Sequence, residues 1–348
     1  MKIFMSDNIL NIVKDHARRY GMMTAKDAAK LVYQNVFGCA HIMGNPDWKK
    51  YLADEYESVT ADITAQSDYI GNGRCRMPLA KAKGLNIGND LLEKVCILSA
   101  ERGGESGDYT EKMEELIEAA KLGELPFEQD DLECFAKMTE PCSHSESYRS
   151  AYKPSYRVAE SKIYLILPVL AAIEKRLENG QRTIVAIDGS AAAGKSTAAA
   201  VISRVFPCSL IHMDDFFLPF DLRTPERLCE PGGNVHYERF FDEVIKKLGS
   251  RFSYRVFDCS SGDYNGENVV DNELLTVVEG SYSLHPYFGD YADIKVFMDV
   301  SESEQISRIL ARSGERMLER FKNEWIPMER RYHKAFEIKM NCDIVINQ

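Results

Sequence analysis

The sequence predicts an α/β fold over residues 179–348, with a parallel sheet and flanking helices, preceded by a mostly α-helical domain over residues 1–178. In the second half, short β-branched apolar runs alternate with amphipathic segments, which is typical of a parallel sheet covered by helices. In the first half, apolar residues recur at helical spacing, and no segment alternates convincingly as a strand. The polar run 178–182 contains a glycine and marks the expected boundary.

The composition narrows the classes of function. No apolar run is long enough to cross a bilayer and the start lacks a signal-peptide pattern, so we expect a cytoplasmic protein with no membrane partner. The net charge of −11 argues against nucleic acid as a partner, because phosphate backbones attract basic surfaces. The nine cysteines include no C-x-x-C pair, which favours reduced thiols over a structural zinc site.

The first domain is expected to be built from amphipathic helices. Their predicted ranges are 7–20, 24–36, 49–66, 89–100, 109–122, 126–139 and 161–178, with one short extended piece at 74–79. Three polar places stand out: 34–41, the pair Arg74 and Arg76, and 143–157. Helix caps, turns and Tyr/Arg packing explain each of them, whereas together they suggest a polar pocket whose ligand the sequence does not name.

The second domain is expected to alternate between strands and helices. The predicted strands are 183–188, 209–213, 251–258, 274–278, 293–300 and 342–346, and the predicted helices are 197–205, 237–248, 301–312 and 323–340. In such a sheet, ligands bind at the carboxyl ends of the strands.

Between the first strand and its helix, the sequence matches G-x-x-x-x-G-K-[ST]. The matching segment and the residue after it are Gly189, Ser190, Ala191, Ala192, Ala193, Gly194, Lys195, Ser196 and Thr197. Glycines let successive N–H groups point into one hollow, and the helix start adds unpaired N–H groups. We therefore predict ATP binding at these residues, with Lys195 on the β- and γ-phosphates and Ser196 on Mg²⁺.

Acidic residues follow the other predicted strands. Asp214 is our candidate general base toward a substrate hydroxyl, and Glu279 is our candidate Mg²⁺ ligand, directly or through water. Asp215 is either a second acid or an N-cap, and Asp258 is a further candidate for substrate binding.

Arg308, Arg312, Arg316 and Arg320 recur every four residues and would share one helical face. Solvated surface charge is the default explanation for such a run. In phosphate-loop kinases, however, a lid that carries arginines occupies this place in the chain. We therefore expect Arg308 at the nucleotide phosphates and Arg312 among the catalytic residues, with the surface explanation kept open.

The second half resembles the uridine kinase and phosphoribulokinase group of P-loop kinases. The resemblance rests on the loop, on H-M-D-D-F-F at 212–217, on E-P-G-G-N-V-H-Y-E-R-F at 230–240, on V-V-E-G at 277–280 and on C-D-I-V-I at 342–346. It implies that Asp214 acts as base toward a ribose 5′-hydroxyl, and that Phe217, His236 and Tyr237 lie at the substrate. Kinases of this group often assemble, so the resemblance is compatible with a homo-oligomer.

The chain departs from that group at several points. His236 stands where the group has an aspartate that grips the ribose diol, Ala192 and Ala193 replace a Ser/Gly pair, and the lid lacks Arg-Gly-Arg. The resulting hypothesis is an ATP- and Mg²⁺-dependent kinase that phosphorylates a hydroxyl of a small, nucleoside-like molecule. The alternatives are a nucleotide sensor in which ATP controls the helical domain and, less favoured, an NTPase that acts on a macromolecule.

Overall fold

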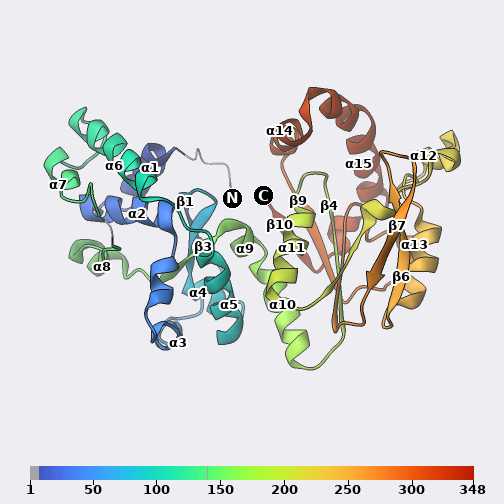
Figure 1. Cartoon of the computed structure of the whole chain (residues 1–348), viewed down its shortest axis with the longest axis horizontal. Coiled ribbons are helices and arrows are strands. Elements are labelled where there is room, and N and C mark those ends of the chain that lie inside the picture. The colour runs from blue at the N-terminus through green and yellow to red at the C-terminus, as the bar shows by residue number, and fades with distance from the viewer. Residues whose placement is uncertain (1–7, 139) are drawn as a thin grey trace. The chain divides into compact units, whose positions relative to one another are not determined.

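The computed structural model describes residues 8–138 and 140–348, and it shows two compact units that divide between Leu167 and Pro168 (Figure 1). Nearly all of α10 (Leu167–Glu178) groups with the second unit, whereas the sequence analysis drew the boundary after this helix. Asp7 and Thr139, the outer ends of two predicted helices, lie outside the described residues. None of the helices in the described part of the chain is long and apolar enough to cross a membrane.

Helices make up most of the first unit, as predicted. They are α1 (Ile9–Arg19), α2 (Ala25–Phe37), η1 (Ala40–Gly44), α3 (Trp48–Ser58), α4 (Leu79–Gly84), α5 (Asn89–Ala100), α6 (Ser106–Lys121), α7 (Gln129–Glu133), α8 (Glu146–Tyr152) and α9 (Ser161–Leu165). A capping box between Thr24 and Asp27 begins α2. The apolar faces of α1, α2 and α6 meet in one core that contains Val13, Leu31 and Leu116.

The first unit also contains a small antiparallel sheet, which corrects the expectation that it lacks strands. Its strands are β1 (Asp68–Gly71), β2 (Arg74–Pro78) and β3 (Tyr156–Glu160), in the order β1-β2-β3. Only β2 matches the short extended piece expected at 74–79. Successive residues 74–77 of β2 are all buried, so the two-residue alternation that reveals a half-exposed strand is missing. The strands β1 and β3 have only four and five residues.

The second unit is built on a parallel sheet, as predicted. The sheet has five strands in the order β10-β9-β4-β8-β5. The strands are β4 (Thr183–Gly189), β5 (Ser209–His212), β8 (Leu275–Glu279), β9 (Ile294–Asp299) and β10 (Ile344–Asn347). The strand β4 is central and almost entirely buried. The fold is thus of the phosphate-loop NTPase type.

Both faces of this sheet are covered. The helix α11 (Lys195–Val205) packs on β4, β5 and β8. A second apolar cluster joins Ile211, Val278 and Phe297 of the sheet to Phe240 and Tyr332. Shorter helical elements of this unit are η2 (Met213–Phe216), η3 (Phe220–Leu222), α12 (Pro225–Cys229), α13 (Tyr237–Glu243), η4 (Ile245–Lys247), η5 (Pro286–Phe288) and η7 (Ile338–Asn341).

The predicted strand at 251–258 forms, but outside the parallel sheet. It is β6 (Phe252–Asp258), which pairs antiparallel with β7 (Asp263–Val270) in a separate hairpin. The sequence analysis missed β7, whose residues are largely exposed and polar, so that it lacks the apolar run that signals a strand.

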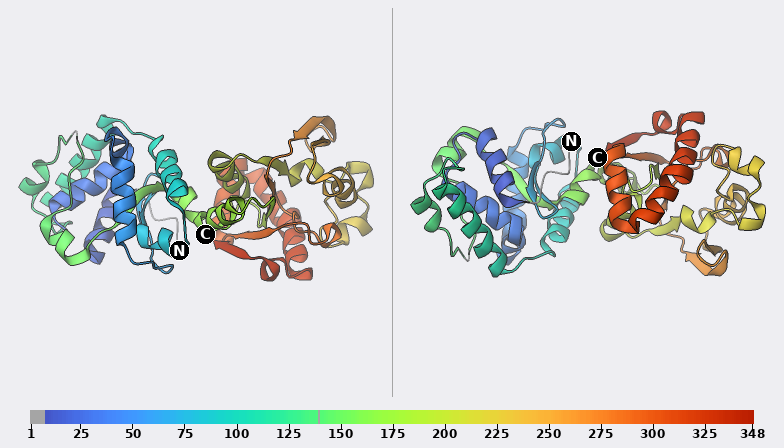
Figure 2. Two further views of the ribbon diagram at one scale, coloured as in Figure 1. Left: turned by 90° about the horizontal axis from the view of Figure 1, so that it is seen from below. Right: turned by 90° about the horizontal axis from the view of Figure 1, so that it is seen from above.

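The arginine-bearing segment is α14 (Glu302–Arg320), capped by Ser301, followed by η6 (Phe321–Trp325) and α15 (Ile326–Ala335). Figures 1 and 2 show α14 and α15 side by side, and Ile309, Leu318 and Ile326 pack together. Gly314 has non-helical dihedrals (φ 75°, ψ 173°) and kinks α14. The expected single face of four arginines is therefore wrong, because the kink separates Arg308 and Arg312 from Arg316 and Arg320.

Candidate active site

The phosphate loop (residues 189–197) joins the central strand β4 to α11. A Cβ atom at Gly189 would lie 2.0 Å from the Met298 carbonyl oxygen, so only glycine fits there. Gly194, with a φ of 83°, is the N-cap of α11. Ala192 is also left-handed, with a φ of 58°. This conformation costs a residue with a side chain about 1–2 kcal/mol, so contacts around the loop must hold it in place.

Two side chains from the end of the chain supply such contacts. Glu329 Oε2 accepts the Ala191 N–H at 2.9 Å, and its Oε1 accepts the Ser281 hydroxyl at 2.6 Å. Gln305 Nε2 donates to the Ala191 carbonyl at 3.1 Å. The sequence analysis missed Glu329 and Gln305, since they lie 138 and 114 residues from Ala191 and no local pattern links them.

Lys195 lies over the mouth of the loop with its side chain buried. Its Nζ donates to the carbonyls of Gly189 and Ser190 at 2.8 and 2.9 Å, and to Ser281 Oγ at 3.2 Å. An ammonium group has three donors, and all three have partners here. A phosphate bound in the loop would compete for these same donors.

The predicted metal ligands are in direct contact. Ser196 Oγ donates to Glu279 Oε2 at 3.1 Å, and the other oxygen, Oε1, lies 2.6 Å from His212 Nδ1. Glu279 and His212 are register partners at the carboxyl ends of β8 and β5, which is why they meet. The hydrogen bond to Glu279 raises the pKa of His212, and burial opposes that shift. His212 belongs to the motif at 212–217, but the sequence alone does not reveal its contact with Glu279.

Asp214 is the second residue after β5, in η2, and is exposed to solvent. Protein atoms nevertheless displace much of its hydration, and this burial together with the charge of Glu279 raises the pKa of Asp214, while Lys195 opposes the shift. The carboxylates of Asp214 and Glu279 and the Lys195 amine therefore lie within electrostatic range of one another. A carboxylate with a raised pKa is a stronger proton acceptor.

The donor set at this place suits Mg²⁺. The Ser196 hydroxyl and the carboxylates of Glu279 and Asp214 are hard oxygen donors, and Mg²⁺ is commonly held by one or two carboxylates together with substrate phosphates and water. Within residues 8–138 and 140–348, no group of three or more His, Cys, Asp or Glu side chains is arranged to hold a metal by itself. Ser196 and Glu279 thus fit a metal ion that arrives with a nucleotide.

Asp215 is bound to the hairpin, where its Oδ2 accepts the Tyr254 hydroxyl at 2.9 Å. Asp258 is the last residue of β6, next to the β6–β7 turn, and its Oδ1 accepts both the N–H and the hydroxyl of Ser260 at 2.7 Å. Burial raises the pKa of the adjacent Cys259, and the charge of Asp214 acts in the same direction. The turn therefore lies within electrostatic range of Asp214. The Asp258 carboxylate itself stabilises the turn through its bonds to Ser260.

Phe217 and His236 come from separate segments that the structure brings together. Phe217 forms an isolated antiparallel bridge with Val235, and the His236 N–H donates to the Phe216 carbonyl at 2.7 Å. His236 Nδ1 is buried without a hydrogen-bond partner. Burial lowers the pKa of His236, and the charge of Arg239 adds to this effect. His236 thus presents a neutral ring with an unused nitrogen beside Phe217.

Tyr237 is fixed by aromatic packing. Its ring stacks on His285 with a centroid distance of 4.7 Å, and the Arg227 guanidinium lies 3.7 Å from the ring centroid. Its hydroxyl donates to Glu230 Oε2 at 3.1 Å. Burial raises the pKa of Tyr237 to about 12. These contacts explain the residue as part of the packing around α13, and nothing in them directs its hydroxyl at Asp214.

The structure separates the two lid arginines that the sequence analysis assigned to the site. Arg308 Nη1 donates to the Ala192 carbonyl at 3.1 Å and to Gln348 Oε1 at 2.8 Å, so it reaches the phosphate loop. Arg312 is exposed and contacts the Ser313 hydroxyl and the Phe321 ring. As placed, Arg308 touches the loop and Arg312 lies apart from it.

Asp188, the last residue of β4 before Gly189, is a buried carboxylate that the sequence analysis noted only as the end of a strand. It accepts the N–H groups of Gly189 and Leu284 at 2.7 and 3.0 Å, and the Tyr332 hydroxyl at 2.8 Å. Burial acts to raise the pKa of Asp188, but His333 and these N–H groups outweigh it, and the pKa is lowered. Asp188 thereby ties the loop to the segment after β8 and to α15.

Comparisons with known proteins add a distant resemblance. No protein-family model matches the sequence, and neither does any curated protein. Among solved structures, a protein described as a possible uridine kinase from Bacillus stearothermophilus is 15% identical, with a TM-score of 0.37, over 50% of this chain and 99% of that chain. A second structure, provisionally described as a fructose transport system kinase from Silicibacter, is 21% identical, with a TM-score of 0.40, over 51% of this chain and 96% of that chain. Both TM-scores are below 0.5.

Proposed function

We propose that the second unit is a kinase that transfers the γ-phosphoryl group of ATP, with Mg²⁺, to a hydroxyl of a small molecule. The observation that carries the proposal is the grouping of Lys195, Ser196, Glu279 and Asp214 around the mouth of the phosphate loop. A nucleotide sensor needs the loop, but it has no need of a carboxylate with a raised pKa at the end of the neighbouring strand.

Each residue has a part in this transfer. The amides of the phosphate loop and the Lys195 amine bind and orient the phosphates. Ser196 and Glu279 would hold Mg²⁺, which neutralises phosphate charge when it is bound. Asp214 accepts the proton of the attacking hydroxyl, and the pKa shift caused by its burial and by Glu279 makes it the better base. Arg308, through its contact with Ala192, positions the loop from α14.

We propose a nucleoside-like alcohol as the acceptor class. Support comes from the motifs at 212–217 and 230–240, and from the approach of Phe217, His236 and the β6–β7 turn to the Asp214 side of the loop. His236 offers a ring nitrogen where the similar kinases have a carboxylate. A neutral imidazole donates or accepts one hydrogen bond per nitrogen and cannot make the bidentate contact to a diol that a carboxylate makes. We therefore expect weaker selection for a ribose diol than a carboxylate would give.

The test is ADP release from Mg-ATP by the full-length protein against a panel of nucleosides, sugars and vitamin-like alcohols. We expect turnover with an acceptor, and a loss of about a hundredfold or more in kcat in Asp214→Asn, because the general base is removed. Asp242→Asn is the matched control, since this exposed carboxylate on α13 pairs only with Lys246 among the described residues. It should leave kcat unchanged.

Nucleotide binding should survive in Asp214→Asn, as measured by calorimetry with ATP, because the loop and Lys195 remain. Acceptor-independent hydrolysis that Asp214→Asn leaves unchanged would contradict the kinase and favour the nucleotide sensor.

A further inference from the structure

The polar places that the sequence analysis singled out in the first unit meet around Arg76. Arg76 Nε donates to Gln34 Oε1 at 2.9 Å, and its guanidinium lies 5.0 Å from the centroid of the Tyr156 ring. The Tyr156 hydroxyl lies 2.6 Å from His144 Nε2 and 3.2 Å from Gln34 Nε2. One helix, the central strand β2 and the segment around α8 thus contribute to one network.

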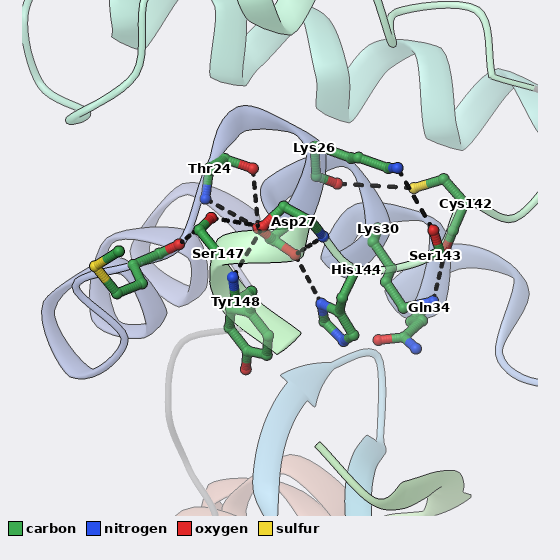
Figure 3. A network of polar contacts seen from close by, with 12 residues as sticks. Thr24, Lys26, Asp27, Lys30, Gln34, Cys142, Ser143, His144, Ser147 and Tyr148 are labelled. Atoms are coloured by element: carbon green, nitrogen blue, oxygen red, sulfur yellow. Dashed lines mark hydrogen bonds and ion pairs between the residues drawn. The ribbon is translucent and has the colours of Figure 1, made fainter. Parts of the chain in front are cut away.

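The helix α2 contributes three polar side chains to the network because of their spacing along the sequence. Asp27, Lys30 and Gln34 recur at three and four residues, so their side chains form one polar stripe. Figure 3 shows these three side chains together with His144, which arrives from the segment just before α8. His144 Nδ1 lies 2.8 Å from Asp27 Oδ1.

The negatively charged group in this network, the Asp27 carboxylate, already accepts hydrogen bonds from its neighbours. Asp27 accepts the N–H and hydroxyl of Thr24 at 3.0 and 2.9 Å, and the N–H and hydroxyl of Ser145 at 3.0 and 2.6 Å. Burial acts to raise the pKa of Asp27, but the hydrogen bonds from His144, Ser145 and Thr24 outweigh it and hold the pKa low. Burial also lowers the pKa of His144, so the ring is neutral near pH 7.

The hydrogen bonds therefore run in one direction. The neutral His144 donates from Nδ1 to Asp27, so its Nε2 accepts the Tyr156 hydroxyl. Tyr156 in turn accepts the Gln34 amide N–H, and the Gln34 carbonyl accepts Arg76 Nε–H. The chain of donors starts at Arg76 and ends at Asp27, and it leaves the positive charge at the Arg76 end.

Two cations in and beside this network, Arg76 and Lys30, form no ion pair with a carboxylate in the described part of the chain, and they lie within electrostatic range of each other. The Arg76 side chain is buried, 3% exposed, and its Nη2 has no hydrogen-bond partner. Asp68, opposite Arg76 in the sheet, is bound to Arg19 and to the Tyr20 hydroxyl, both at 2.6 Å. The partly buried Lys30 amine donates to a neutral carbonyl, that of Cys142, at 2.7 Å. Burying such charges without a counter-ion is costly.

We propose that Arg76 and Lys30 bind a phosphate group of a small metabolite in the first unit. A phosphate monoester carries about −1.5 to −2 charge near neutral pH and three acceptor oxygens. It would supply both the missing counter-charge and the acceptor that Arg76 Nη2 lacks. Guanidinium and ammonium groups are the usual ligands of phosphate in proteins. Lys26 lies one turn before Lys30 on α2, and its Nζ donates to Ser143 Oγ at 3.5 Å, so it adds a third cation near Lys30 (Figure 3).

The experiment measures binding of inorganic phosphate to the full-length protein by calorimetry, and locates it by hydrogen exchange with mass spectrometry. We expect phosphate to protect peptides from 24–37 and 142–157. Lys30→Met should weaken this binding about ten- to a hundredfold, the usual effect of losing a hydrogen bond to a charged group. Lys30→Arg, which keeps the charge, should retain most of it. Lys14→Met is the matched control, because Lys14 pairs with Glu124 outside the network.

The peptide of the phosphate loop serves as an internal reference, so the result does not depend on kinase activity. Protection confined to 189–197, or equal phosphate affinity in Lys30→Met and the unaltered protein, would overturn the proposal. Binding of citrate without binding of phosphate at matched ionic strength would also overturn it. Tighter binding of ribose 5-phosphate than of inorganic phosphate would support it and assign the group to a phosphorylated metabolite, whereas the reverse order would support free phosphate as the ligand.

Discussion

His212 shows how a single contact at the loop becomes a pH-dependent contribution to stability. Its bond to Glu279 raises its pKa in the folded protein above the ordinary value of 6.5. The contribution of the His212–Glu279 contact to the free energy of unfolding is therefore complete below pH 6.5. It is lost as the pH rises through the folded-state pKa of His212. A buried carboxylate with a lowered pKa, such as Asp188, acts in the opposite sense, and its contribution is lost toward acid.

We therefore expect His212→Gln to lower the melting temperature at pH about 5.5, and to do so progressively less as the pH rises to about 8.5. Thermal unfolding followed by circular dichroism across this range measures the difference. Gln keeps a polar side chain of similar reach without a titrating charge. A difference that grows with pH would mean that His212 is bound to Glu279 in its neutral form.

Residue types and their local spacing allowed the sequence to predict part of the site. The glycines, Lys195 and Ser196 follow from a fixed motif, and Glu279 and Asp214 follow from their places after strands, which the parallel register then brings together. Glu329 and Gln305 could not be predicted in this way. Their role depends on tertiary contacts with Ala191, and a lone carboxylate within a helical pattern has no local feature that distinguishes it from a solvated one.

Among the helices and strands, too, those that local sequence determines could be predicted, and those that depend on distant partners could not. The strands of the parallel sheet are short apolar runs and could be located from the sequence. The strands β1, β3 and β7 could not, because they are short or polar and owe their conformation to their partners in the sheet. The kink in α14 also escaped prediction, since a single glycine inside a helical pattern is often tolerated without a break.

Gly314 permits a test at the level of this element. Its φ of 75° lies in the left-handed region, and a Cβ atom there would meet nothing within 4 Å, so a substitution would be opposed by backbone strain alone. We expect Gly314→Ala to destabilise the protein by about 1 kcal/mol, measured by urea denaturation. Gly107→Ala, at a helical glycine with equal room, should not destabilise. Stabilisation by Gly314→Ala would show that α14 is continuous in solution.

At the scale of the whole molecule, each unit has a core and a sheet of its own. A unit of this size buries enough apolar surface to fold alone. We expect a fragment of residues 166–348 to unfold cooperatively and to bind ATP within about twofold of the full-length affinity, since every contact described around the loop lies within it. Calorimetry of the fragment measures both. Aggregation, or loss of ATP binding, would show that the second unit depends on the first.

Glu329 joins the phosphate loop to α15 through one carboxylate, which grips the Ala191 N–H with one oxygen and the Ser281 hydroxyl with the other. A nucleotide phosphate is an anion that would accept hydrogen bonds from the same amides. Its binding and the packing of α15 against the loop are therefore energetically coupled. Such coupling is reciprocal. If nucleotide binding weakens the contact between Glu329 and the loop by a given factor, then the contact of Glu329 weakens nucleotide binding by the same factor. Substitutions along α15, which forms no part of the loop, would therefore change how tightly ATP is held.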